Sequence, residues 1–320
     1  MRNKIYASLK LLLPFVAIAF SILVYYAIKD NGKQKQTEHP YYLFLLAAIG
    51  AVIIIEIVIG FFNSSVKKRI ITKAPFLTGA IVFLLLLNII TTKTTLLPTL
   101  YFPSLDRIVG VLVENRVFLL QNILDSFKLL AVGFIWGASV GFLTGLALGY
   151  FKTVGYWLNP ITKIIGPIPT TAWIPLALST VPTTQSANIF LIAFAVWFPV
   201  TLMTSSGIQS INNVNFEVSR TLGASTLYQI FHVAIPAAMP SIFLGVFYGT
   251  VSSFATLMAV EMNGNSSGIG WYINWQKSVM MYDGVYAGLI LIAVICSLTL
   301  TLLFKVRDKV LIWQKGVIKW

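Results

Sequence analysis

Residues 123–150, ILDSFKLLAVGFIWGASVGFLTGLALGY, are the stretch on which the fold class of this chain depends. Beyond Asp125 and Lys128 near its start, the stretch carries no charged side chain. It exceeds the length of about 20 residues that a helix needs to cross a hydrocarbon core of ~30 Å. Because backbone polar groups inside lipid must pair within their own segment, we expect a membrane-spanning helix here.

Similar apolar runs recur along most of the chain, in which 57% of the residues are hydrophobic and 10% are charged. The sequence therefore predicts an all-α polytopic membrane protein with about eight spans. We place the spans at about 9–28, 41–62, 75–92, 123–150, 157–181, 187–206, 236–259 and 285–304.

The formal charge of +13 could indicate nucleic-acid binding, but the basic residues form short clusters between the apolar runs. This distribution is typical of membrane topology, so nucleic acid is not expected as a partner. Lys29, Lys33 and Lys35 oppose the orientation that we predict, but the later clusters outweigh them. Both termini and the loop around Glu217 are then cytoplasmic. The inside segments receive Arg2, Lys4, Lys10, Lys67, Lys68, Arg69, Lys73, Lys152, Arg220, Lys305, Arg307, Lys309, Lys315 and Lys319.

Cysteine and histidine are scarce, with Cys296 inside an apolar run and only His39 and His232 elsewhere. We therefore expect no disulfide framework, no metal site and no cofactor bound by this chain.

A glycine recurs at every fourth position of residues 133–149. Such a stripe lets another backbone approach one face of the helix closely. We interpret it as helix packing within the subunit, with a subunit interface as the alternative. The stripe consists of Gly133, Gly137, Gly141, Gly145 and Gly149.

Prolines interrupt the fifth predicted span at Pro167, Pro169 and Pro175. Each proline removes an amide donor, so this span cannot be a plain helix. Freed carbonyls at membrane depth are tolerated against protein or a water-filled cavity, so we predict that the segment lines a translocation pathway. A structural kink is the alternative, and Trp173 would gate the pathway or fill space.

The outer turn after the seventh span, residues 261–270, contains one carboxylate. Glu261 and Asn263 are predicted to contact the solute, and a solvated turn is the alternative. Ionisable groups inside spans are costly and indicate function by default. These are Glu56, for which the sequence offers no partner, and Asp125 with Lys128, which are spaced to pair along a helix.

The loop from Asn212 to Pro236 is predicted to form two short amphipathic helices that meet at Gly223. Asn215 is the expected N-cap, and Glu217 suits the positive end of the first helix dipole. Pro236 would start the next span, where its missing donor costs little. The apolar faces, which suggest docking into a partner's groove, are Val218 and Leu222, then Leu227, Ile230 and Phe231. A helix on the bilayer surface is the alternative, but only Arg220 and His232 offer positive charge.

Residues 217–225, EVSRTLGAS, followed by Ile235-Pro236, resemble the coupling loop of ABC importer permeases. Residues 167–175 and the Glu261 turn with Ser266-Ser267-Gly268-Ile269-Gly270 are similar to the group that handles nitrate, taurine, alkanesulfonates, bicarbonate and some vitamin precursors. The resemblance extends from about Leu97 to the carboxyl terminus. It departs from the family at Val218 and Ser219, which replace two alanines, and at Val181-Pro182-Thr183-Thr184, which replaces Phe-Gly.

The resemblance implies a type I importer core of about six helices in residues 75–320, with residues 1–74 as an accessory hairpin and basic loop. It implies a multi-pass protein of the bacterial inner or plasma membrane. The implied partners are a cytoplasmic ABC ATPase dimer that holds ATP and Mg²⁺, a second permease copy, an extracytoplasmic solute-binding protein, a small-molecule solute and membrane lipid. The residues implied in ATPase coupling are Glu217, Arg220, Thr221, Leu222, Gly223, Ala224, Ser225 and Pro236.

The chain has no phosphate-binding loop of the Gly-x-x-x-x-Gly-Lys-Ser/Thr type, so it is not expected to hydrolyse ATP itself. The main alternative function is a secondary transporter driven by an ion gradient, with Glu56, Asp125 and Lys128 as its relay. A membrane enzyme is less well supported, because no span presents a catalytic pair. The solute does not follow from the sequence.

Overall fold

The computed structural model describes residues 2–313, so Lys315 and Lys319 of the charge argument lie outside the described residues. The described part of the chain is helical and contains no strand. It includes 7 helices that are long and apolar enough to span a membrane, or 8 spans if one bent pair counts as a span. The all-α polytopic fold with about eight spans is therefore confirmed.

The chain divides into two compact units. The first unit ends at Val117 and also takes in Gln276–Ala287. The second unit comprises Phe118–Trp275 and the described residues from Gly288 onward.

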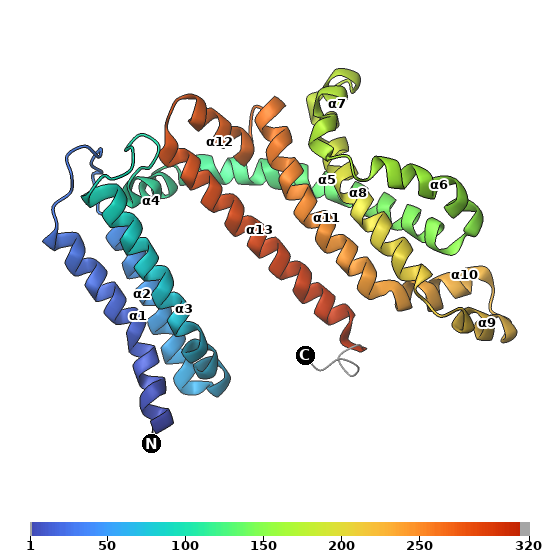
Figure 1. The fold of residues 1–320 in the computed structure, drawn as a ribbon, viewed down its shortest axis with the longest axis horizontal. Helices are drawn as coiled ribbons and strands as arrows, with labels where there is room; N and C mark the ends of the chain where they lie inside the picture. Colours follow the sequence, from blue (N-terminus) through green and yellow to red (C-terminus); the bar gives the residue numbers. More distant parts are fainter. Residues whose placement is uncertain (1, 314–320) are drawn as a thin grey trace. The chain divides into compact units, whose positions relative to one another are not determined.

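Three helices form the first unit's bundle: α1 (Arg2–Ala27), α2 (Tyr41–Phe62) and α3 (Ser64–Asn88), with α3 packed against both others (Figure 1). Their core is apolar, with Tyr42 and Leu46 of α2 fully buried beside Ile81 of α3. The boundary expected at residue 74 falls inside α3, whose N-cap is Asn63. The basic cluster from Lys67 to Lys73 thus lies on a helix that packs with the first two spans.

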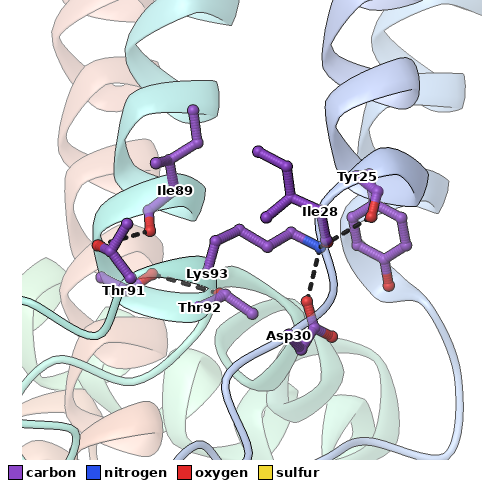
Figure 2. A network of polar contacts seen from close by, with 8 residues as sticks. Tyr25, Ile28, Asp30, Ile89, Thr91, Thr92 and Lys93 are labelled. Carbon is purple, nitrogen blue, oxygen red and sulfur yellow. Dashed lines mark hydrogen bonds and ion pairs between the residues drawn. The ribbon is translucent and has the colours of Figure 1, made fainter.

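A buried lysine closes the upper end of this bundle, where α3 runs into the π-helical turn η1 (Ile89–Lys93) (Figure 2). The Lys93 side chain is 2% exposed, and its Nζ donates to Asp30 Oδ1 at 2.6 Å. It also donates to the carbonyls of Tyr25 at 2.8 Å and Ile28 at 2.6 Å. Because all three ammonium hydrogens have acceptors, the buried charge is compensated and ties α3 to the end of α1.

The short helix α4 (Leu105–Glu114) also belongs to the first unit and directly precedes α5. Asp106 of α4 is buried, and its Oδ1 accepts the Tyr42 amide at 2.9 Å. Since Pro40 gives α2 no side-chain cap, Asp106 supplies the missing acceptor from another helix. Burial is the main cause that raises the pKa of the Asp106 carboxyl above its ordinary value.

The second unit is built on α5 (Arg116–Tyr150), α8 (Thr184–Gln209) and α11 (Ile235–Gly264), and α8 and α11 pack along their lengths (Figure 1). The glycine stripe of α5 faces α8 of the same chain. A Cβ at Gly141 would lie 2.8 Å from the Trp197 carbonyl oxygen, and one at Gly145 would lie 2.7 Å from that of Thr201. Thr144 and Thr201 share a hydrogen bond of 2.7 Å across this contact.

The fifth span is broken, as the prolines predict. Helix α6 (Lys152–Ile165) and the pair η2 (Thr170–Trp173) and α7 (Ile174–Thr180) meet at a bend of 87°. The last two helices of the described residues are α12 (Ile269–Ser278) and α13 (Tyr282–Val310).

Candidate functional site

The loop between α8 and α11 begins with α9 (Asn213–Thr221). Its N-cap is Asn212, whose Oδ1 accepts the Val214 amide at 3.0 Å. The prediction of Asn215 as the cap is therefore wrong. The extended backbone that a cap requires occurs at Asn212, and the Asn215 amide already donates to the Asn212 carbonyl within the first turn.

Gly223 ends α9 with a φ of +83°, a conformation that favours glycine. The Gly223 amide donates to the Arg220 carbonyl and the Ala224 amide donates to the Ser219 carbonyl, each at 3.0 Å. This pair of bonds is a Schellman motif, which satisfies the last carbonyls of the helix. A Cβ on Gly223 would meet nothing within 4 Å, so backbone conformation rather than space requires glycine here.

The second helix of the loop, α10 (Thr226–Gln229), begins at Ser225, whose Oγ accepts the Tyr228 amide. It is not a separate helix as predicted, because it continues through the π-helical turn η3 (Ile230–Ala234) into α11. Pro236 lies in the first turn of α11, where its missing amide leaves a gap in the α-helical bonding that the wider turn accommodates.

Gln229 holds the two helices of this loop together, a role that no local sequence pattern predicts. Its side chain is buried, and its Oε1 accepts the Tyr150 hydroxyl of α5 at 2.8 Å. Its Nε2 donates to the Phe216 carbonyl at 3.2 Å and to Ser219 Oγ at 3.0 Å. Ser219, which departs from the family's alanine, is thus part of a network that fixes α9 to α10 and α5.

The exposed surface of the loop, formed by residues 213–231, is named the knob. Val218, Leu222 and Leu227 are exposed on it, with Leu222 82% exposed, whereas Ile230 is buried and was wrongly predicted to share this face. Glu217, Arg220, Thr221 and Ser225 are exposed as well, and Ala224 is half-buried. The knob therefore presents apolar side chains on a rigid support.

The predicted pathway residues of the broken span are mostly on its surface. Pro167, Pro169 and Pro175 are exposed, whereas Trp173 is half-buried and its ring meets Phe194 edge-on with centroids 5.8 Å apart. The core of the second unit joins α7 with α11 around Ile174, Ala177, Leu257 and Val260. The broken span and the part of α11 that precedes Glu261 therefore belong to one packed core.

Glu261 is 1% exposed and lies beneath its own loop. Its Oε2 accepts the Gly270 amide at 2.7 Å, while Asn122 and Ser126 of α5 accept the amides of Gly268 at 2.9 Å and Ile269 at 2.8 Å. Three side chains thus cap the first turn of α12 from two other helices. A Cβ on Gly268, where φ is +112°, would collide with the Glu261 carboxylate.

The remaining polar and ionisable candidates are dispersed. Asn263 is exposed and donates to the Ala259 carbonyl of its own helix. Lys128 pairs with Asp125 at 3.4 Å, with the Lys128 side chain exposed and Asp125 half-buried, while Glu56 lies half-buried on α2. Among residues 2–313, no group of three or more metal-ligating side chains could hold a metal ion.

Residues 137–311 match the family described as binding-protein-dependent transport system inner membrane component. Relatives include a putative ABC transporter permease of Methanocaldococcus jannaschii, 29% identical over 67% of this chain and 82% of the relative. A putative aliphatic sulfonates permease of Bacillus subtilis is 32% identical over 58% of this chain and 67% of the relative. A nitrate import permease of Synechocystis is 34% identical over 48% of this chain and 55% of the relative.

Among solved structures, the inward-facing MetNI methionine ABC transporter contains a chain that superposes with a TM-score of 0.50. It is 18% identical and covers 62% of this chain and 98% of that chain, which supports the type I importer fold. The sulfonate and nitrate relatives are of the group that the sequence resembles. The chain belongs to the family of binding-protein-dependent transport system inner membrane components and is a permease subunit of an ABC importer.

Proposed function

We propose that the knob is the surface through which this permease docks onto the cytoplasmic ATPase subunits of its importer. The observation that carries the proposal is an apolar surface, with Leu222 82% exposed, held by a Schellman motif and by buried Gln229. A rigid apolar projection fits helix-in-groove recognition, in which the partner's groove receives regularly spaced anchors. Because Gln229 links α9 to Tyr150, a displacement of the knob would be transmitted to α5.

The residues proposed to couple to the ATPase are those that surround this surface: Glu217, Arg220, Thr221, Leu222, Gly223, Ala224, Ser225 and Pro236. The ATPase dimer would bind ATP and Mg²⁺ and alternate between open and closed states. The permease would convert that movement into tilting of its spans. A second copy of the permease and an extracytoplasmic binding protein complete the proposed assembly, and Pro167, Pro169, Trp173, Pro175, Glu261 and Asn263 are the proposed pathway segment.

The test is copurification of ATPase with the tagged chain from mild detergent, quantified by mass spectrometry and by ATP hydrolysis. Leu222→Asp and Glu217→Lys change exposed side chains, so neither should disturb folding. We expect Leu222→Asp to lower the recovered ATPase about tenfold, as for loss of an interface anchor. Leu96→Asp is the matched control, because Leu96 is a leucine of similar exposure outside the knob. Undiminished ATPase recovery and transport in both knob variants would refute the assignment.

A further inference from the structure

A cavity of about 1070 Å³ opens in the second unit beside the knob. The last residues of α5 and α8 line it, including Tyr150 and Gln209, and so do the first residues of α6 and α9, Lys152 and Asn213. Helices α5 and α8 are candidate membrane spans, so their ends mark the level at which the chain leaves the hydrocarbon. The cavity therefore lies at the depth of lipid headgroups.

The cavity has an excess of positive charge. Lys152 and Lys163 of α6 and Arg220 of α9 line it against a single carboxylate, Glu217. The ion pairs found among the described residues involve none of these three cations. Two helix N-termini and two C-termini meet at the cavity, so their partial charges largely cancel. The side chains therefore set its sign, and it is suited to an anion.

The donors in the cavity are of the kinds that bind phosphate. A guanidinium presents a planar fork of donors to phosphate oxygens, and ammonium groups add mobile point charges. The other face of α6 exposes Trp157, Ile161 and Ile164, and Tyr156 lies at the cavity wall. Tryptophan and tyrosine at a membrane boundary anchor a helix among headgroups, which places the two lysines near phospholipid phosphates.

We propose that this cavity is a phosphate-binding site that holds the headgroup of an anionic phospholipid or a soluble phosphate compound. The group would be held between Arg220 on α9 and one of the two lysines of α6, since Lys152 and Lys163 lie about 16 Å apart along the helix axis. A phosphate in this position would bridge the broken span to the knob. If the knob docks an ATPase as proposed above, the bound phosphate would also stiffen the coupling surface, but the binding itself does not depend on that function.

The test is native mass spectrometry of the full chain, purified with its complement of lipids and titrated with phosphatidylglycerol, phosphatidylcholine or inorganic phosphate. The variant Lys152→Gln/Lys163→Gln removes two of the three cations. Its control is Lys68→Gln/Lys73→Gln, which removes two exposed lysines from α3, outside the cavity. The variant Lys152→Arg/Lys163→Arg keeps both charges and separates loss of charge from loss of folding.

We expect the wild type to retain phosphatidylglycerol in preference to phosphatidylcholine. The Gln variant should bind it roughly tenfold more weakly, because each basic residue near the surface contributes a few-fold in affinity. The α3 control and the Arg variant should bind like the wild type. Lysine-dependent binding of inorganic phosphate without lipid retention would support the same site with a soluble ligand. Equal binding of both probes by the wild type and the Gln variant would overturn the proposal.

Discussion

Lys93 carries a buried positive charge in the first unit, and three acceptors compensate that charge. Lys93→Met would leave Asp30 and two backbone carbonyls without their donor, so we expect a loss of about 3 kcal/mol, the usual effect of breaking a buried pair. Asp30→Asn should cost less, since the Asp30 side chain is 36% exposed and the lysine keeps two acceptors. Thermal melts of the detergent-solubilised variants check this order. A Lys93→Met melting temperature equal to that of the wild type would contradict it.

Glu261 is expected to act as a cap for α12 rather than through its charge alone. Glu261→Gln keeps an oxygen that can accept the Gly270 amide, whereas Glu261→Leu leaves that buried amide without a partner. We expect Glu261→Leu to cost about 1 to 3 kcal/mol and Glu261→Gln clearly less. Hydrogen exchange of residues 268–272, compared between the two variants, measures the cap directly. Equal exchange in Glu261→Leu and the wild type would show that Asn122 and Ser126 suffice.

At the scale of elements, the glycines of α5 bring its backbone close to that of α8. A Cβ at Gly137 would collide with the carbonyl of Ala193 and lie 2.8 Å from its Cα, so backbone would have to move. We expect Gly137→Ala to destabilise the chain by about 2 kcal/mol through overpacking. Gly79→Ala on α3 is the control, because nothing lies within 4 Å of its added Cβ. The melting temperature should fall for Gly137→Ala and hold or rise for Gly79→Ala.

Features that arise within one helix are predicted from the sequence, whereas contacts between distant helices are not. Apolar length predicts the spans, and the proline positions predict the broken fifth span, because both effects act within one segment. The N-cap of α9 was misplaced because Asn212 and Asn215 are chemically equivalent candidates and only backbone conformation selects between them. The buried role of Gln229 depends on Tyr150, far along the chain, which local patterns do not encode. Likewise, the first turn of α12 that Glu261 caps is also capped by the distant Ser126 of α5.

At the scale of the molecule, family resemblance predicted more than composition did. The motifs around Glu217 and Glu261 identified the importer group, whereas hydropathy alone left a secondary transporter open. Neither the family resemblance nor hydropathy predicted that α3 packs with α1 and α2. All three are apolar helices, and hydropathy does not specify which helices meet. The predicted relay residues offer no further support for gradient-driven transport, because Asp125 and Lys128 pair only with each other, within one turn of α5, and Lys128 is exposed.

The number of spans decides on which side of the membrane the knob lies. If α6 and α7 together cross the membrane, three crossings separate Leu96 from Leu222, made by α5, by the α6–α7 pair and by α8. The two leucines then lie on opposite sides. If the pair turns back, only α5 and α8 cross the membrane between Leu96 and Leu222, so both leucines lie on the same side. A knob on the outer side could not meet a cytoplasmic ATPase.

Cysteine labelling resolves this count. The chain has a single cysteine, Cys296, so Cys296→Ser provides the background for Leu96→Cys and Leu222→Cys. Both leucines are exposed, so each new thiol should be reachable in the folded chain. A membrane-impermeant maleimide should label Leu96→Cys in intact cells and Leu222→Cys only after permeabilisation. Labelling of both positions in intact cells would mean that the broken span returns to the side it left, and the docking surface would have to be sought elsewhere.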